Sequence, residues 1–112
     1  MQYLTASAKF GDIFLCEFPF TDGIQSKLRP SLVLQDFGED VLICRITSVP
    51  HNETGDVKIV AWEKSGLLKP STIRLCRLVT IEKSLLLRKI GEQSETDKKI
   101  LVSLWNNTML LK

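Results

Sequence analysis

Histidine and cysteine are scarce in this sequence. It contains one histidine, His51, and three widely spaced cysteines, Cys16, Cys44 and Cys76. Because no Cys-x-x-Cys pair and no Cys/His cluster occurs, the sequence does not predict a zinc site, and we expect neither a metal nor another cofactor. Each cysteine lies in an apolar or β-like run, so we expect buried free thiols, as is usual in a reducing cytoplasmic compartment.

Long apolar runs and a large net charge are also missing. The longest apolar stretch is far shorter than the ~20 residues that a membrane-spanning helix needs. The start, MQYLTASAKFGDIF, lacks the basic and apolar regions of a signal peptide. The net charge is only +2, so any cationic surface must be local. With 112 residues, 44% of them apolar and 25% charged, the chain is expected to form one cytoplasmic domain, residues 1–112, that contacts no membrane.

Short strands are expected over most of the chain. The first, IFLCEFPF, is rich in aromatic and β-branched residues and follows the turn signal Gly11-Asp12. Polar segments at 21–27 and 48–55 are typical of loops. The expected strands are Ile13–Phe20, Pro30–Gln35, Val41–Thr47, Val57–Trp62 and Ser71–Val79. Because these runs do not alternate with helical segments, they favour a mainly β fold, a small barrel or roll.

The C-terminal part of the chain changes to a helical period. Ser94 is a suitable N-cap, and Asp97 follows three residues later. The side chains that recur at helical spacing are Ile100, Leu101, Leu104, Trp105 and Thr108. This pattern predicts an amphipathic helix that packs on the barrel. A shorter helical turn is expected over Lys83–Lys89, ended by Gly91.

Four polar residues near the ends of expected strands could carry chemistry. Arg29 precedes a proline, so its backbone is extended, and its planar guanidinium could grip a phosphate through two hydrogen bonds. A surface salt bridge is the alternative for this arginine. The hydroxyls of Thr47 and Ser48 could donate to a phosphate oxygen, or Thr47 could only cap the turn. His51 could move a proton near neutral pH, although a lone loop histidine is more often a bystander.

Three blocks of the sequence, in order, resemble the MazF/PemK family of toxins. They are GDIFLCEFPFTDGIQSKLRPSLVLQD, VLICRITS and SGLLKPSTIRLCRLVTIEKSLLLRKIG, and the expected helix follows them. The combination of Arg-Pro before an aliphatic strand, Thr-Ser at the end of the next strand, LKPS and TIEKSLL is specific to that family. The resemblance implies an SH3-like small barrel of the CcdB/MazF type with helices, usually as a homodimer.

The resemblance also implies an activity, that of a metal-independent endoribonuclease in a type II toxin–antitoxin pair. The ribose 2'-hydroxyl of single-stranded RNA would attack the adjacent phosphate, leaving a 2',3'-cyclic phosphate and a 5'-hydroxyl. The family's arginine maps to Arg29 and its catalytic threonine to Thr47, while the proton-transfer group stays open between His51, Glu17 and Asp22. A cognate antitoxin would cover the RNA groove, and operator DNA would be bound only through that antitoxin.

The RNA groove is expected between the loop at 21–27 and the loop after Ser48. Arg74 and Arg77 alternate with apolar residues on the last expected strand, so they lie either along the RNA path or at a solvated edge. The predicted RNA-binding residues are Thr21, Asp22, Gln25, Lys27, Ser48, Arg74 and Arg77. Gln25 stands where some relatives carry a glutamate, in a loop that looks a residue shorter, which leaves the base and the cut-site sequence open.

Two other functions fit the same fold. CcdB toxins poison a topoisomerase through a C-terminal Trp-Gly-Ile tail, whereas Trp105 is followed here by two asparagines and seven residues remain. A barrel that binds nucleic acid or a partner without catalysis is the other alternative. The presence of both Arg29 and Thr47 argues against it.

Overall fold

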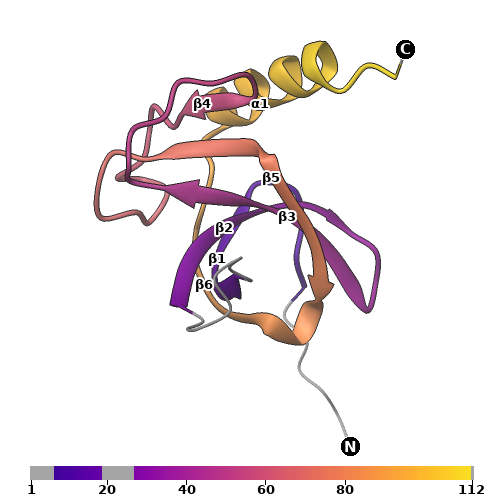
Figure 1. Cartoon of the computed structure of the whole chain (residues 1–112). Coiled ribbons are helices and arrows are strands. Elements are labelled where there is room, and N and C mark those ends of the chain that lie inside the picture. The colour runs from indigo at the N-terminus through magenta and orange to yellow at the C-terminus, as the bar shows by residue number, and fades with distance from the viewer. Residues whose placement is uncertain (1–6, 19–26, 112) are drawn as a thin grey trace, which may run out of the picture.

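One antiparallel sheet and one long helix make up the fold. The computed structural model describes residues 7–18 and 27–111, without the side chains of Phe18 and Lys27. The six strands follow the order β4-β5-β3-β2-β1-β6, and the sheet curls into a small barrel beneath the C-terminal helix (Figure 1). The elements are β1 Asp12–Phe18, β2 Lys27–Asp36, β3 Asp40–Thr47, β4 Asp56–Lys58, β5 Thr72–Glu82, β6 Leu86–Glu92 and α1 Glu95–Thr108. The mainly β barrel with a C-terminal helix is therefore confirmed.

Alternating side chains along the strands give the sheet two separate cores. One cluster lies inside the curl of the sheet and contains Phe14, Cys16, Val33, Val41 and Ile43. The other lies on the opposite face, between the sheet and α1, and contains Ile13, Leu32, Cys44, Ile46 and Leu101. Neighbouring residues of a strand thus enter different cores, as the period of two requires. Among the described residues, no helix is long and apolar enough to cross a membrane.

The three cysteines do not share one environment. Cys16 and Cys44 are buried as expected, and burial raises the pKa of both thiols. Cys76 is exposed, so the expectation of a buried thiol is wrong there. Its position explains the difference, because the β3–β5 pairing jumps between Cys44 and Arg45 at this point. Such an irregularity interrupts the in-and-out alternation of a strand.

The predicted N-cap of α1 is present, and Asp97 in the first turn of the helix also accepts hydrogen bonds from a distant segment. The Ser94 hydroxyl accepts the Asp97 N–H at 3.1 Å. The two carboxylate oxygens of Asp97 then accept the N–H groups of Val60 and Ala61, each at 2.9 Å. One buried carboxylate therefore joins the start of the helix to a segment that lies far away in the sequence.

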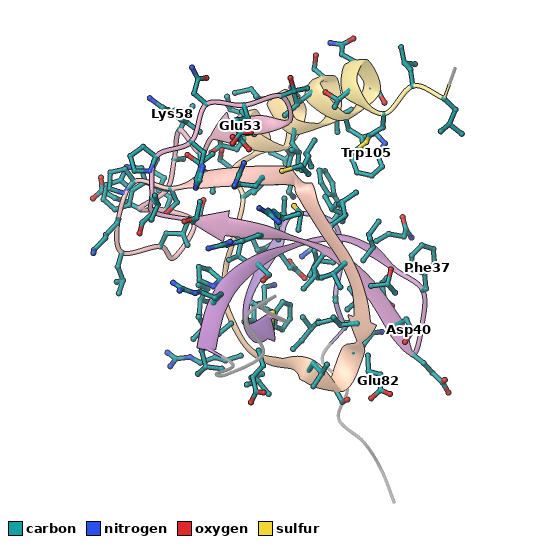
Figure 2. The ribbon with its side chains drawn as sticks, in the orientation of Figure 1. Phe37, Asp40, Glu53, Lys58, Glu82 and Trp105 are labelled. Carbon is teal, nitrogen blue, oxygen red and sulfur yellow. The ribbon has the colours of Figure 1, made fainter. Side chains whose placement is uncertain are left out.

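The apolar face of α1 agrees with the prediction except at one position. Leu101 is fully buried, and Leu104 and Trp105 pack against the same core. Figure 2 shows Trp105 on the side of α1 that faces the sheet. Ile100 is 37% exposed, so its predicted packing on the barrel is wrong.

The strand expected over Val57–Trp62 is wrong for most of its length. Only Asp56–Lys58 pairs, with β5, and residues 60–66 form consecutive turns. The reason is the Asp97 carboxylate, which takes the two backbone N–H groups that a longer strand would have used. Gly66, the last residue of these turns, lines the site described below together with the segment that follows it.

The helical turn expected over Lys83–Lys89 is also mostly wrong. A single 3-10 turn covers Lys83–Leu85, and the chain then continues as β6. Pairing with β1 overrides the local preference, since β6 takes the free edge of that strand with two register shifts. The resulting strand brings Arg88 and its neighbours next to β1.

Asp97→Asn tests how far the fold depends on this carboxylate. The amide has one acceptor oxygen instead of two, so one buried backbone N–H loses its partner, and we expect a loss of roughly 1–3 kcal/mol in the free energy of unfolding. Urea denaturation measures it. The control is Glu95→Gln, which removes an exposed carboxylate from the same helical turn and is expected to change stability by less than ~1 kcal/mol. Equal effects of the two variants would contradict the role given to Asp97.

Candidate active site

An open pocket of about 520 Å³ brings together residues from five parts of the chain. Its apolar floor, which is buried or half-buried, consists of Leu15, Pro30, Ile46, Leu67 and Ile90. Its polar rim consists of Arg29, Thr47, Ser48, Lys69, Ser71, Arg88 and Lys89. A cavity of this size and composition falls in the range of small-molecule sites, and its excess of basic groups favours an anionic ligand.

The pairing of β2 with β3 places the two principal candidates in this pocket. Ser31 lies opposite Arg45, and the same antiparallel register carried two residues further aligns Arg29 with Thr47. Both residues line the pocket together with Ser48, which is exposed. The structure therefore brings together three of the residues that the sequence analysis singled out.

The hydroxyl of Thr47 has one defined contact. Thr47 is largely buried, and its Oγ1 accepts the backbone N–H of Val49 at 3.1 Å, which caps the turn after β3. The capping interpretation is therefore correct as geometry. The Thr47 hydroxyl can still contact a ligand, because a hydroxyl that accepts one hydrogen bond can donate its own proton to another group.

Basic side chains gather around the ends of β2, β3 and β5. Arg45 is half-buried, and its pKa is lowered first by burial and then by the positive charges of Arg29, Arg77 and Arg74. Like charges that lie this close repel one another, so an anion bound among them would relieve the repulsion. Arg45 is not among the residues predicted from the sequence, although its position at the end of an otherwise apolar strand face was a signal for it.

Arg74 occupies a different environment from the one expected of an RNA-binding residue. It is 4% exposed, its Nε donates to Asp56 at 3.0 Å, and its terminal nitrogen donates to Glu53 at 3.0 Å. Figure 2 shows Glu53 next to β4, over β5. The guanidinium thus joins the loop after β3 to the sheet, and its burial argues against direct contact with RNA. Arg77, in contrast, is exposed on β5.

His51 belongs to the same ion-pair cluster rather than to the pocket lining. Ligand atoms of His51, Glu53 and Asp56 all lie within 4.8 Å of one another. These residue types can hold a metal ion, but both Asp56 oxygens already accept hydrogen bonds, from Arg74 and from the Glu53 N–H. Arg74 therefore supplies the positive charge that this cluster needs. Because His51 lies in this cluster and not in the pocket lining, its position argues against a role in proton transfer in the pocket.

Four predicted residues remain without a described side chain. Thr21, Asp22 and Gln25 lie outside the described residues, and Lys27 is described only as the first residue of β2. Glu17 is exposed on β1, two residues beyond Leu15 of the pocket floor on the same strand face. It therefore stays a candidate for proton transfer, as does Asp22.

Sequence reasoning missed three basic residues of the rim, Lys69, Arg88 and Lys89. They reach the pocket because residues 65–66 pack directly on β6: a Cβ atom on Gly66 would clash with the Ile90 carbonyl, and one on Gly91 with the Ser65 carbonyl. The glycine of SGLLKP and the one after Arg-Lys-Ile were a weak signal of such a close approach. Backbone contact between segments so far apart in sequence cannot be read from spacing.

Comparison with known proteins points to one family. A sequence profile of the family described as "PemK-like, MazF-like toxin of type II toxin-antitoxin system" matches residues 9–103. Among curated protein sequences, none matches the chain.

Several solved structures share the fold over nearly their whole length. The toxin MazF-mt6 of Mycobacterium tuberculosis is 23% identical, with a TM-score of 0.72 over 90% of this chain and 98% of that one. An endoribonuclease from a mycobacterial species is 13% identical, with a TM-score of 0.73 over 96% and 95%. A mycobacterial endoribonuclease in complex with its cognate antitoxin is 15% identical, with a TM-score of 0.75 over 95% and 98%.

Asp56→Asn tests the ion pair that fixes the loop after β3. Burial alone would raise the pKa of Asp56, but the Glu53 N–H, Arg74 and the charge of His51 hold it below its ordinary value of 3.8. A lowered pKa stabilises the fold above the unfolded-state value, and this contribution is lost as the pH falls through the folded-state pKa. We expect the variant to be less stable by about 2 kcal/mol at pH 7. The difference should shrink below about pH 4.

Urea midpoints between pH 7 and pH 2.5 measure this difference. Glu63→Gln is the control, because it removes an exposed carboxylate from the turns at 60–66. A gap between wild type and Asp56→Asn that stays constant down to pH 2.5 would contradict the assigned ion pair.

Proposed function

The chain belongs to the PemK-like, MazF-like toxins of type II toxin–antitoxin systems, and on that premise we propose that it cuts single-stranded RNA as an endoribonuclease. The observation that carries the proposal is the meeting of Arg29 and Thr47 in one pocket with a basic rim. An arginine and a hydroxyl beside each other can bind the oxygens of one phosphate group. Two structural neighbours whose names identify them as endoribonucleases support the same activity.

The reaction proposed is a transesterification followed by release of the product. The 2'-oxygen of a ribose attacks the adjacent phosphorus while the bond from phosphorus to the 5'-oxygen breaks. A base takes the proton of the 2'-hydroxyl, and an acid gives a proton to the departing 5'-oxygen. The products are a 2',3'-cyclic phosphate and a 5'-hydroxyl, and neither proton transfer requires a metal ion.

Arg29 and Thr47 have complementary tasks in this scheme. Negative charge grows on the two non-bridging phosphate oxygens in the pentacoordinate transition state, and the fixed positive charge of Arg29 stabilises it. Thr47, held at the end of β3 by its bond from Val49, donates its hydroxyl proton to a phosphate oxygen. For the proton transfers, the position of Glu17 on the strand face of Leu15 favours a carboxylate over His51.

The partners follow from the family. A cognate antitoxin, which accompanies one structural neighbour, would neutralise the toxin by covering the RNA groove. Binding to operator DNA would then occur only through that antitoxin. We place the protein in the cytoplasm, where its substrate and its antitoxin are made.

Incubation of the protein in EDTA with a long single-stranded RNA tests the proposed activity. We expect discrete cuts with cyclic-phosphate and 5'-hydroxyl ends, and a rate at least ~10²-fold lower for Arg29→Ala and for Thr47→Ala. Primer extension and end-specific labelling measure the products. Lys99→Ala, on the exposed side of α1, is the control and should cut at the wild-type rate. Intact RNA with folded wild-type protein would refute the proposal.

A homodimer is part of the proposal, and an uncharged surface is available for it. The concavity between α1 and the β2–β3 hairpin is lined by Phe10, Leu34, Gln35, Leu42, Leu101, Val102 and Trp105, none of which is charged. Depletion of charge is the compositional mark of an interface core. A second copy of the chain would cover this surface.

Sedimentation at micromolar concentration tests the dimer. We expect the mass of two chains for the wild type and that of one chain for Val102→Asp, because a carboxylate buried in an apolar interface would lose its hydration. Asn107→Asp adds the same charge to the exposed face of α1 and should remain dimeric. A wild-type protein that sediments as a monomer would contradict this part of the proposal.

A further inference from the structure

The rim of the pocket has a second basic side that the proposed chemistry does not use. Lys69 comes from the segment after the turns at 60–66, and Arg88 comes from β6. Both side chains are exposed. The third basic residue on this side, Lys89, is different, because it pairs with Asp12 at 3.2 Å and with Glu92 at 3.7 Å.

Among the described residues, no carboxylate forms a salt bridge with Lys69 or Arg88. Acidic groups do pair with other lysines close by, since Lys9 and Lys89 share Asp12 and Glu92. The two rim cations are thus left for a ligand, while their neighbour is neutralised within the protein. Two uncompensated cations on one side of a pocket favour an anion with more than one negative oxygen.

The floor of the pocket adds a second requirement to the ligand. Leu15, Pro30, Ile46, Leu67 and Ile90 offer a mostly apolar surface between the two basic sides. A simple anion would gain nothing from that surface, whereas a nucleotide has both a phosphate and a flat base with little charge. RNA-binding proteins commonly take up single-stranded bases in this way, splayed out against the protein surface.

From this arrangement we propose that the pocket binds the nucleotide next to the scissile phosphate, with its outer phosphate on Lys69 and Arg88 and its base on the apolar floor. The inference rests on the proposed function, because Arg29 and Thr47 define where the scissile phosphate lies. It adds a direction for the RNA, which crosses the pocket from the ends of β2 and β3 toward β6. Lys69 and Arg88 act on binding and do not touch the bond that breaks.

The test uses an RNA oligonucleotide that spans one mapped cut site and carries a 2'-deoxy sugar there, so that it binds without being cut. Its affinity for the full chain is measured over a range of salt concentrations for the wild type, Lys69→Ala, Arg88→Ala and the double variant. Each lost phosphate contact should reduce the slope of log affinity against log salt by ~0.7. The affinity should fall about three- to tenfold for each variant.

Two controls separate charge from structure. Arg88→Lys should keep the wild-type slope, because a lysine retains the charge. Lys64→Ala removes an exposed cation from the turns at 60–66, outside the pocket lining, and should change neither slope nor affinity. With cleavable RNA, Lys69→Ala and Arg88→Ala should raise KM and leave kcat unchanged.

The contact between the nucleobase and the apolar floor is tested by changing the RNA. Abasic sites are placed one at a time on both sides of the cut, and we expect a loss of affinity at one position next to it. Wild-type slope and affinity in the double variant, while the wild type still cuts RNA, would overturn the inference and leave the proposed function intact. A double variant that binds RNA as the wild type does, but is no longer inhibited by an acidic protein partner, would also overturn the inference and leave the proposed function intact. Failure of the wild type both to cut and to bind RNA would overturn both.

Discussion

The antiparallel register between β2 and β3 is the constraint on which the candidate site depends. Ser31 opposite Arg45 fixes which side chains of the two strands meet, and the same register aligns Arg29 with Thr47. A shift by one residue would move every side chain of a strand to the other face of the sheet. Both cores resist that shift, because Leu32, Cys44 and Ile46 fill one side while Val33 and Ile43 fill the other. Packing far from the pocket thereby sets its geometry.

Charge is concentrated at this end of the sheet although the chain as a whole is nearly neutral. The net charge of +2 required any basic surface to be local, and Arg29, Arg45 and Arg77 provide it. Arg74 and Lys89 contribute less to this basic surface, because carboxylates of the protein neutralise their charges. Basic residues that look alike in the sequence thus have different environments: Arg74 and Lys89 pair with carboxylates of the protein, whereas Lys69 and Arg88 are exposed on the rim of the pocket.

The sequence predicted those parts of the molecule that depend on local pattern. Alternating apolar residues identified four of the six strands, and the cap at Ser94 identified the start of α1. It failed where distant contacts decide the outcome. The turns at 60–66 depend on the Asp97 carboxylate, and β6 depends on the edge of β1. The same difference holds for the pocket. Its residues Arg29, Thr47 and Ser48 were predicted from the sequence motif and from their positions at strand ends. Lys69 and Arg88 were not predicted, because they reach the pocket through backbone packing at Gly66 and Gly91.

In the proposed mechanism, the phosphate to be cleaved lies between Arg29 and Thr47. A crystal structure of the protein with an RNA oligonucleotide that carries a 2'-deoxy sugar at a mapped cut site tests it most directly. We expect the scissile phosphate to lie within hydrogen-bond distance of the Arg29 guanidinium and of Thr47 Oγ1. An oligonucleotide bound with that phosphate outside the pocket, and with Arg29 and Thr47 in contact only with protein, would contradict it.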